Sequence, residues 1–371
     1  MCKHQEPDVR HSNTLRDVDP SRYFDNAATT PVDPLVVREM VPFLSEHYGN
    51  ANSVHSAGRR AMAAVELARE RVALLLAAED PSQVVFTSGA TEANNWILQA
   101  FPNAVVSPFE HSSIREPATQ MGLRTLANEE EHLLPLAEDA SLLSVMGVNN
   151  ETGTLWNPQD LKGKARRVHA DLTQAAGKLN SDVKDLDFAT ISAHKFYGPK
   201  GVGAIYIRDG YLPPMIIGGE QEQGLRSGTL NVPGIVGMGV AAEIAMERRE
   251  ADFSHAENLR QVVMETLEKV TDVQVNGGSR RSPFILSVSF LGVYGETLVL
   301  EADLKGYAMS SGAACSTGST DPSPVLQAMG IEESWNRGTV RISFGRANMP
   351  ESAAGLAASL QYSVKKLRTM T

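Results

Sequence analysis

The chain has 371 residues, of which 42% are hydrophobic, and its formal net charge at pH 7 is −10. This length is sufficient for two hydrophobic cores. The sequence contains no apolar run of about 18 residues or more, so no membrane insertion is expected. The negative net charge argues against direct, sequence-independent binding of nucleic acids, because such binding depends on clustered lysines and arginines.

Residues 1–22 are polar and charged, and they lack the apolar central segment of a signal peptide. We interpret them as a flexible N-terminal extension, and we expect a cytoplasmic protein. The two cysteines, Cys2 and Cys315, cannot form a disulfide framework.

Helical and strand-like segments alternate between about residue 56 and residue 250. The pattern predicts a helix over 59–76, a strand over 84–87 and a second helix over 91–99. Further short apolar strands are predicted over 104–106, 142–146, 189–192 and 203–207. Strands of this kind are typical of a mostly parallel sheet that is buried on both faces. The sequence therefore predicts an α/β fold.

The pattern changes after Glu250. Two strands predicted over 286–290 and 340–344 alternate apolar and polar residues, which indicates a sheet with one exposed face. We predict a second, smaller α+β domain in this part of the chain.

Lys195 ends a strand-like stretch and is followed at once by a Gly/Pro turn, and Asp171 ends an earlier apolar run. A lysine at such a strand end can form an imine with pyridoxal phosphate (PLP), while a carboxylate keeps the pyridine nitrogen of that cofactor protonated. A solvent-exposed lysine in a turn is the alternative interpretation of this local sequence.

A strand, a turn of small residues and a helix follow one another over 84–92. The free N–H groups at the start of such a helix, together with its dipole, form an anion site that suits the phosphate of PLP. An ordinary capped helix start is the alternative interpretation.

His111 follows the strand over 104–106, at the end of the sheet where ligands gather. An ordinary surface histidine is the alternative.

Cys315 lies in a segment, 310–320, in which every other residue is Ser, Gly, Ala or Thr. Such a segment has no side chain that can anchor it in a core, so we predict a mobile, exposed loop. An exposed thiol on a moving loop can attack the sulfur of a bound substrate as a thiolate and then pass that sulfur on. A buried structural cysteine usually has apolar neighbours, which Cys315 lacks.

Several motifs in order resemble the NifS/IscS-like cysteine desulfurases, a group of class V, fold-type I PLP enzymes. The resemblance extends from about Tyr23 to about Met349. The motifs that carry it are 23–30 (YFDNAATT), 49–55 (GNANSVH), 87–95 (TSGATEANN), 148–153 (VNNETG), 171–174 (DLTQ), 193–201 (AHKFYGPKG), 226–231 (RSGTLN) and 310–315 (SSGAAC).

This resemblance implies a fold-type I PLP-dependent transferase with a large, mostly parallel-sheet α/β domain and a smaller α+β domain. We expect the large domain to span 36–250. The small domain is expected to be discontinuous, with residues 23–35 joined to 251–371, and to carry the Cys315 loop.

The resemblance also implies roles for individual residues. Lys195, Cys315 and His111 would be catalytic, and Arg341 would clamp the substrate carboxylate through its planar guanidinium. Arg346 is a rival for that role that the sequence does not exclude. The residues expected to hold PLP are Ala90, Thr91, His111, Asn150, Asp171, Gln174, Ser192, His194, Lys195 and, from the other subunit of a homodimer, Thr229. Among these, Gln174 and Asn150 match positions that contact the phenolic oxygen and the substrate side. No metal ion is expected.

The expected reaction converts L-cysteine to L-alanine and places the sulfur on Cys315 as a persulfide. An acceptor protein, such as an iron–sulfur scaffold, would receive it. A selenocysteine lyase or cysteine-sulfur lyase on the same fold is the alternative, since neither need depend on Cys315. The chain departs from the family at Gln223, where an arginine is usual, and in its shorter segments between His111 and Asn149 and between Asn150 and Asp171.

Overall fold

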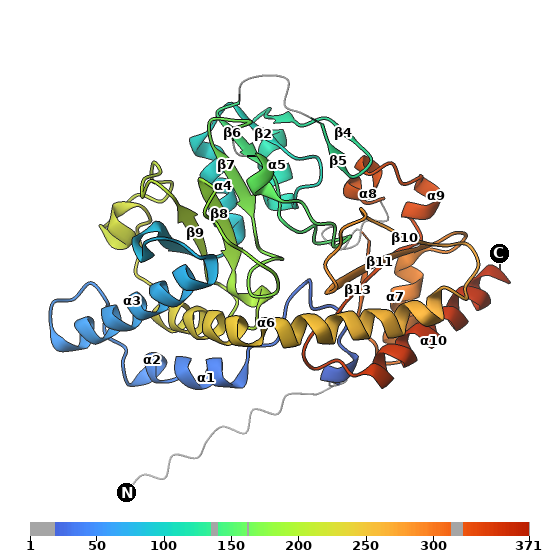
Figure 1. The fold of residues 1–371 in the computed structure, drawn as a ribbon. Coiled ribbons are helices and arrows are strands. Elements are labelled where there is room, and N and C mark those ends of the chain that lie inside the picture. The colour runs from blue at the N-terminus through green and yellow to red at the C-terminus, as the bar shows by residue number, and fades with distance from the viewer. Residues whose placement is uncertain (1–18, 135–139, 162, 313–321, 371) are drawn as a thin grey trace, which may run out of the picture.

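The structure is a computed structural model that describes residues 19–134, 140–161, 163–312 and 322–370. Its largest sheet has seven strands in the order β1-β9-β8-β7-β6-β2-β3 (Figure 1). Neighbouring strands from β8 to β3 are parallel, whereas β9 is antiparallel to both β1 and β8. The bounds are β1 Val84–Thr87, β9 Gly203–Ile207, β8 Phe188–Ser192, β7 Val168–Asp171, β6 Leu142–Ser144, β2 Ala104–Val106 and β3 Arg124–Thr125.

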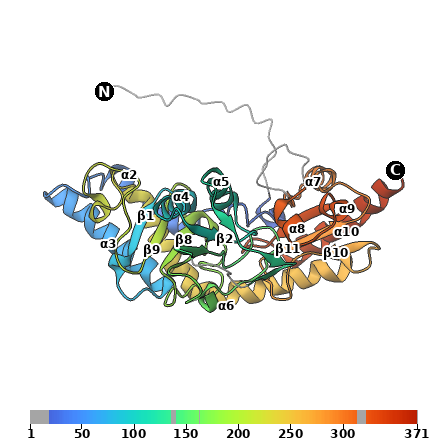
Figure 2. The same ribbon diagram turned by 90° about the horizontal axis from the view of Figure 1, so that it is seen from above.

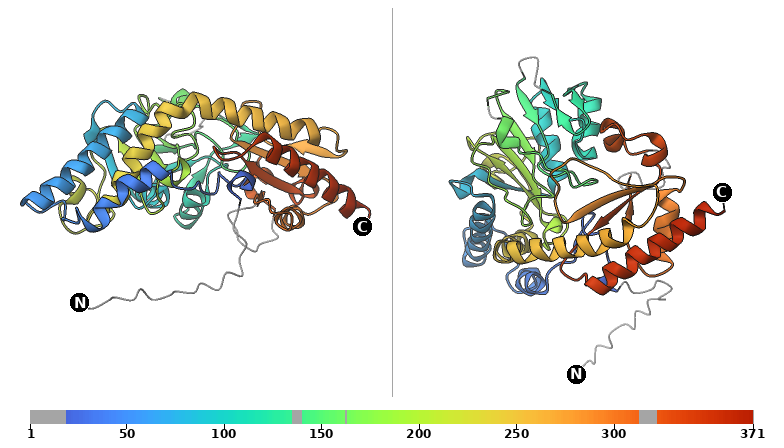
Figure 3. Two further views of the ribbon diagram at one scale, coloured as in Figure 1. Left: turned by 90° about the horizontal axis from the view of Figure 1, so that it is seen from below. Right: turned by 45° about the vertical axis from the view of Figure 1, so that its right-hand side comes forward.

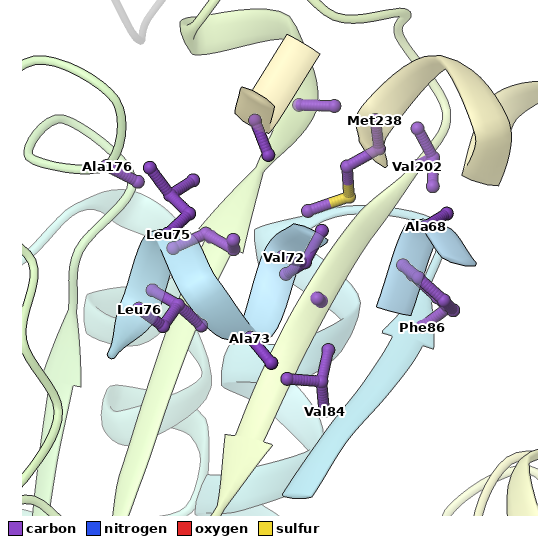
Figure 4. Packing of buried hydrophobic residues seen from close by; sticks show 14 of the residues in the cluster. Ala68, Val72, Ala73, Leu75, Leu76, Val84, Phe86, Ala176, Val202 and Met238 are labelled. Carbon is purple, nitrogen blue, oxygen red and sulfur yellow. The ribbon is translucent and has the colours of Figure 1, made fainter. Parts of the chain in front are cut away.

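The sheet forms because these short apolar strands are buried on both faces, as predicted. Helix α3 covers one face with side chains spaced by three or four residues, among them Val65, Val72 and Leu76. Figure 4 shows this packing, with Val84 and Phe86 of β1 on one side and Met238 on another. The other helices of this region are α1 Pro34–Met40, α2 Pro42–Ser45, α3 Ser56–Leu76, α4 Ala90–Ala100 and α5 Ser112–Gln120.

The second sheet has the order β10-β11-β13-β12 and is antiparallel in each pairing. Its strands are β10 Val273–Val275, β11 Ile285–Phe290, β13 Thr339–Ser343 and β12 Ser310–Ser311. Bridges from Tyr23 to Ala308 and from Asp25 to Ser343 bring the start of the described chain beside this sheet. The helices around it are α7 Gly295–Asp303, α8 Pro324–Ala328, α9 Glu333–Asn336 and α10 Pro350–Arg368.

The prediction of an exposed face on this sheet was wrong, because every residue of β11 and β13 is buried. Their polar side chains form internal hydrogen bonds instead of meeting water. Asn276 Nδ2 donates to the hydroxyl oxygens of Ser287 and Ser289, at 3.1 and 2.8 Å, and Arg341 lines the cavity described below. In this sheet, the polar positions of the alternating pattern therefore face buried polar groups and the cavity instead of solvent.

Helix α6, Val232–Leu267, runs along both sheets (Figures 1 and 3). Seen from above, the two sheets lie at successive positions along this helix (Figure 2). Its first half contributes Met238 and Ala242 to the core of the large sheet, and its second half contributes Leu259 and Val263 to the core of the small sheet. The change in sequence pattern at Glu250 thus falls inside one continuous helix.

Several short elements complete the chain. A hairpin of β4 (Asn128–Glu129) and β5 (His132–Leu133) occupies the shortened segment after His111. Short 3-10 helices span Pro20–Arg22, Pro81–Gln83, Pro158–Leu161, Ala193–Lys195 and Gln221–Gly224. The first of these is tied down by a 3.1 Å contact between the hydroxyls of Ser21 and Ser352, so the predicted extension is ordered at its last residues. No helix in the described part of the chain is long and apolar enough to cross a membrane.

Candidate active site

One cavity of about 580 Å³ opens at the carboxyl ends of the parallel strands, where β7, β8 and the start of α4 meet. This is the edge of an α/β sheet at which ligands usually bind. Ten of the residues predicted from the sequence line it, namely Ala90, Thr91, His111, Asn150, Asp171, Gln174, Ser192, His194, Lys195 and Arg341. Their roles stay predictions, but the fold brings them into one space.

Two predicted residues are not part of this cavity lining. Cys315 lies outside the described residues. Thr229 is exposed, and the structure places it in the segment that follows the 3-10 turn over 221–224. Its predicted contact with the cofactor of a partner subunit therefore remains a prediction.

Lys195 ends the 3-10 turn that directly follows β8. Its Nζ donates to the backbone carbonyls of Ala27 and Ala28, at 2.7 and 2.8 Å. Both carbonyls belong to the segment beside the small sheet. The amine is therefore held in the cavity by a part of the chain about 170 residues away in sequence.

Asp171 is the last residue of β7, and its side chain is buried. Its Oδ1 accepts from the Thr173 N–H at 2.9 Å, and its Oδ2 accepts from Asn94 Nδ2 at 2.9 Å. Two donors fix the orientation of a carboxylate. Asp171 is thus a rigidly held carboxylate in the cavity wall.

Asn94 is in turn oriented by a buried polar network. Its Oδ1 accepts from the hydroxyl of Thr190 at 2.7 Å, so its Nδ2 must face Asp171 and Ser113. Behind Thr190 lies His169, whose ring also contacts the Ser144 hydroxyl at 2.9 Å. Burial lowers the pKa of His169 to about 4, so this ring is neutral at physiological pH.

His111 caps α5, and the backbone N–H of Ser113 donates to its Nδ1 at 3.1 Å. Because that nitrogen accepts a hydrogen bond, the proton of the neutral ring lies on Nε2. Burial lowers the pKa of His111, with Asp171 opposing the effect. A neutral ring with a defined tautomer, in the cavity wall, can stack on a flat ligand and exchange a proton.

The N-terminus of α4 forms another part of the wall. Gly89 precedes it with φ 156°, and no side chain caps the helix. Gly203 lies against Gly89, and this position also requires glycine, since a Cβ on Gly203 would lie 2.7 Å from the Gly89 Cα. Close backbone approach and uncapped N–H groups together suit a phosphate.

Arg341 and Arg346 are separated by the structure. Arg341 on β13 lines the cavity, donating to the Asn150 carbonyl at 3.0 Å and to Asp25 Oδ1 at 2.8 Å. Arg346 instead stacks on the ring of Tyr197, with its Cζ 3.9 Å from the ring centroid, and pairs with Asp252 at 2.7 Å. Only the first arginine faces the site, which favours Arg341 for the carboxylate of a substrate.

The donor set fits PLP. Buried polar atoms without a hydrogen-bond partner occur on three residues of the cavity wall, at Asn150 Oδ1, Thr173 Oγ1 and Arg341 Nε. Buried polar groups are normally satisfied, so these atoms indicate a polar ligand. An amine, a fixed carboxylate and an uncapped helix start match the aldehyde, the pyridine nitrogen and the phosphate of this cofactor.

Residues 22–355 match the family model described as aminotransferase class-V. The chain belongs to this family. Family members of this kind depend on PLP, in agreement with the fit of the cavity. The cysteine desulfurase IscS of Clostridium botulinum is similar to this chain, with 37% identity over 94% of the chain and 96% of the relative.

Solved structures support the same family. A NifS-like protein is similar with a TM-score of 0.84 and 34% identity, over 93% of this chain and 99% of that protein. A structure described as SspA in complex with cysteine is similar with a TM-score of 0.73 and 31% identity, over 88% of this chain and all of that one. The predicted fold-type I architecture is therefore confirmed.

Sequence reasoning did not single out several residues that support the site. Asn94, Ser113 and Thr190 hold Asp171 or His111 through the network described above. Asn94 stands inside the 87–95 motif, but its partners lie up to 96 positions away along the chain. A pattern along the chain does not reveal such contacts; only the packing of helix α4 on the sheet creates them.

Proposed function

We propose that this protein is a PLP-dependent cysteine desulfurase, which converts L-cysteine to L-alanine and passes the sulfur to an acceptor. The observation that carries the proposal is the cavity that holds both Lys195 and the fixed carboxylate of Asp171. The family match, and relatives named cysteine desulfurase IscS at 37% identity, support the same activity.

Bound PLP supplies an aldehyde for the imine and a ring that accepts the electrons of a bond broken at Cα. We propose that Lys195 holds the aldehyde carbon, that Asp171 keeps the ring nitrogen protonated, and that the N-terminus of α4 holds the phosphate with Ser192 and His194. Burial lowers the pKa of His194 to about 4, so its neutral ring can hydrogen-bond without adding charge.

The remaining polar residues would act on the substrate. Arg341 is proposed to bind the carboxylate of cysteine, because its buried guanidinium retains an unpartnered Nε in the cavity wall. Lys195 would take up the Cα proton of the substrate, and the neutral ring of His111 could transfer a proton close by. Asn150 and Gln174 would orient substrate and cofactor.

Sulfur transfer is assigned to Cys315 by resemblance. Its thiolate would attack the substrate sulfur, so that an S–S bond forms while the carbon–sulfur bond breaks. The electron pair of the broken bond stays with the three-carbon skeleton, which takes up a proton and leaves as alanine. The persulfide on Cys315 is then available to an acceptor protein, for which an iron–sulfur scaffold is our candidate.

Mass spectrometry after brief exposure to cysteine tests this assignment. We expect one added sulfur on the peptide that contains Cys315, and none on that peptide in Cys315→Ser, which should still bind PLP and cysteine. Cys2→Ser is the matched control and should behave like the wild type. Full activity in Cys315→Ser would instead support a cysteine-sulfur or selenocysteine lyase.

We further propose a homodimer in which Thr229 contacts the phosphate in the partner subunit. Large apolar side chains are exposed on α1, α2 and the segment before Thr229, including Leu35, Val41, Leu44 and Ile217. A second copy of the chain would remove this apolar surface from water.

Mixing Thr229→Ala, which should bind PLP more weakly, with the inactive Lys195→Ala tests the shared site at limiting PLP. In a heterodimer of Thr229→Ala and Lys195→Ala subunits, one site has an intact Lys195 and receives an intact Thr229 from its neighbour. Partial recovery of activity is expected. Absence of recovery, with subunit exchange verified, would show that each site is built within one chain.

For the domains, we propose 36–250 and 23–35 with 251–371, following the two hydrophobic clusters that contain Val36 and Phe24, respectively. Helix α6 is shared between them. A cytoplasmic location stays a prediction from the sequence.

A further inference from the structure

Lys178 is a buried lysine immediately behind the candidate active site. It lies in the turn after β7, and its residue surface is 6% exposed. Its Nζ donates to Gln174 Oε1 at 3.3 Å and lies 5.9 Å from the ring centroid of Phe284. The amine is thus enclosed between the large-sheet region and the core of the small sheet.

The surroundings of this amine are unfavourable for a positive charge. In the part of the chain that the structure describes, no carboxylate lies within ion-pair distance of Lys178 Nζ. Lys195 and Arg341 are the charged groups that act on it. Burial, followed by these two cations, lowers the pKa of Lys178 to about 7. A methionine would fill similar volume without the cost of burying an amine, so packing alone does not account for a lysine here.

The hydrogen bond from Lys178 determines which way the amide of Gln174 points. As an ammonium, Lys178 can only donate, so the amide oxygen must face it, whereas the reversed amide would place its NH₂ group against the ammonium. Nε2 of Gln174 consequently donates to the Ala27 carbonyl at 2.8 Å. That same carbonyl accepts from Lys195 Nζ, so Lys178, Gln174 and Lys195 form one connected chain of polar contacts.

We propose that Lys178 is a positioning residue of the PLP site, which fixes the Gln174 amide so that it offers an N–H donor, not its oxygen, to the cofactor. Gln174 lines the cavity, and its Nε2 carries a second N–H beyond the one used by Ala27. This inference rests on the proposed function and on the proposed contact between Gln174 and the phenolic oxygen of PLP.

Lys178→Met tests the inference, with the exposed Lys184→Met as the matched control. Two quantities are measured: the affinity of the apo protein for PLP, and the pH at which the visible absorption of the reconstituted protein changes. For Lys178→Met we expect roughly tenfold weaker PLP binding, as for the loss of one hydrogen bond to a charged group. The spectral transition should move to higher pH, because an anionic oxygen that loses a donor holds a proton more tightly.

A double-variant cycle separates positioning through Gln174 from any other effect. In a Gln174→Ala background, adding Lys178→Met should cause no further loss of PLP affinity and no further spectral shift. Wild-type behaviour of Lys178→Met, or losses that add fully in the double variant, would overturn the inference.

Folding is followed separately by denaturant unfolding of the apo proteins. Lys178→Met should be at least as stable as the wild type at pH 7, because it removes a buried amine. If Lys178→Met does not fold, the same measurements on Lys178→Leu test the positioning role. A wild-type protein that fails to bind PLP would overturn the proposed function, whereas normal PLP binding with an unaffected Lys178→Met overturns the positioning role alone.

Discussion

Asn94 donates hydrogen bonds both to the carboxylate of Asp171, at 2.9 Å, and to the hydroxyl of Ser113, at 2.8 Å. One buried amide therefore connects the acid proposed to hold the pyridine nitrogen with the residue that orients His111. The two sides of the cavity are thus aligned by one neutral side chain of helix α4.

Asn94→Ala tests the importance of this connection. The substitution removes a donor from a buried carboxylate, so we expect a loss of about 1.5–3 kcal/mol in the free energy of unfolding, measured with denaturant. Turnover of cysteine should also fall, because Asp171 becomes free to rotate. The control is Asn95→Ala, because the Asn95 amide donates to the backbone carbonyls of Thr91 and Ser113 and not to Asp171. Equal turnover in both variants would contradict the prediction.

Lys195→Ala should abolish the visible absorption that the wild type gains on reconstitution with PLP, because no imine can form. Lys200 also lines the cavity but is exposed, so Lys200→Ala should keep that absorption. Absorption spectra of the two reconstituted variants distinguish the amines. An unchanged spectrum in Lys195→Ala would assign the imine to another residue.

Arg341→Ala and Arg346→Ala should produce different defects. Loss of Arg341 removes a charge-assisted contact to the substrate carboxylate, so KM for cysteine should rise by about tenfold to a hundredfold. Loss of Arg346 breaks its pair with Asp252 and its stacking on Tyr197, so it should lower stability and leave KM nearly unchanged. Steady-state kinetics and thermal unfolding check the pair, and a larger KM effect at Arg346 would reverse the assignment.

Glu151→Gln should change how stability depends on pH. Burial raises the pKa of Glu151 to about 7, and its carboxylate accepts from the Ser323 hydroxyl. The folded protein thus binds more protons at this site than the unfolded chain between about pH 4.5 and pH 7. The contribution of Glu151 to stability is greatest below that range and is lost as the pH rises through it.

Glutamine cannot ionise but can still accept the hydrogen bond from Ser323. The stability of Glu151→Gln relative to the wild type should therefore increase from pH 5 to pH 7 and then level off. Denaturant unfolding of the apo proteins measures this difference. The exposed Glu247→Gln provides the control, and a difference that is constant with pH would contradict the prediction.

The local patterns predicted the large sheet well. Strands β1 and β9 have the bounds expected from their apolar runs, and α3 begins three residues before its predicted start. Short buried strands and long amphipathic helices are specified by nearby residues, which explains this agreement. The hairpin of β4 and β5 was missed because its polar residues carry no such pattern.

The second sheet and the supports of the site depend on contacts between distant segments. Ser287 and Ser289 looked like surface residues, but Asn276 satisfies both hydroxyls in the interior. No local pattern singles out Lys178, and its burial beside Phe284 results from packing between the two sheets. Motifs at strand ends identified the candidate catalytic and cofactor-binding residues. The residues that hold those side chains in place are recognised only from the packing of the folded chain.

Helix α6 is continuous and packs against both sheets. The relative position of the two sheets, and with it the geometry of the cavity, therefore depends on how far this helix turns between them. Lys195 lies with the large sheet and Arg341 lies on the small one, and the first and second halves of α6 pack in the respective cores. One residue inserted near Glu250 would rotate the second half by about 100° and advance it by about 1.5 Å relative to the first. Such an insertion would keep every functional side chain and still misalign the lysine with the arginine, so the number of residues in this helix constrains the protein as strictly as their identity does.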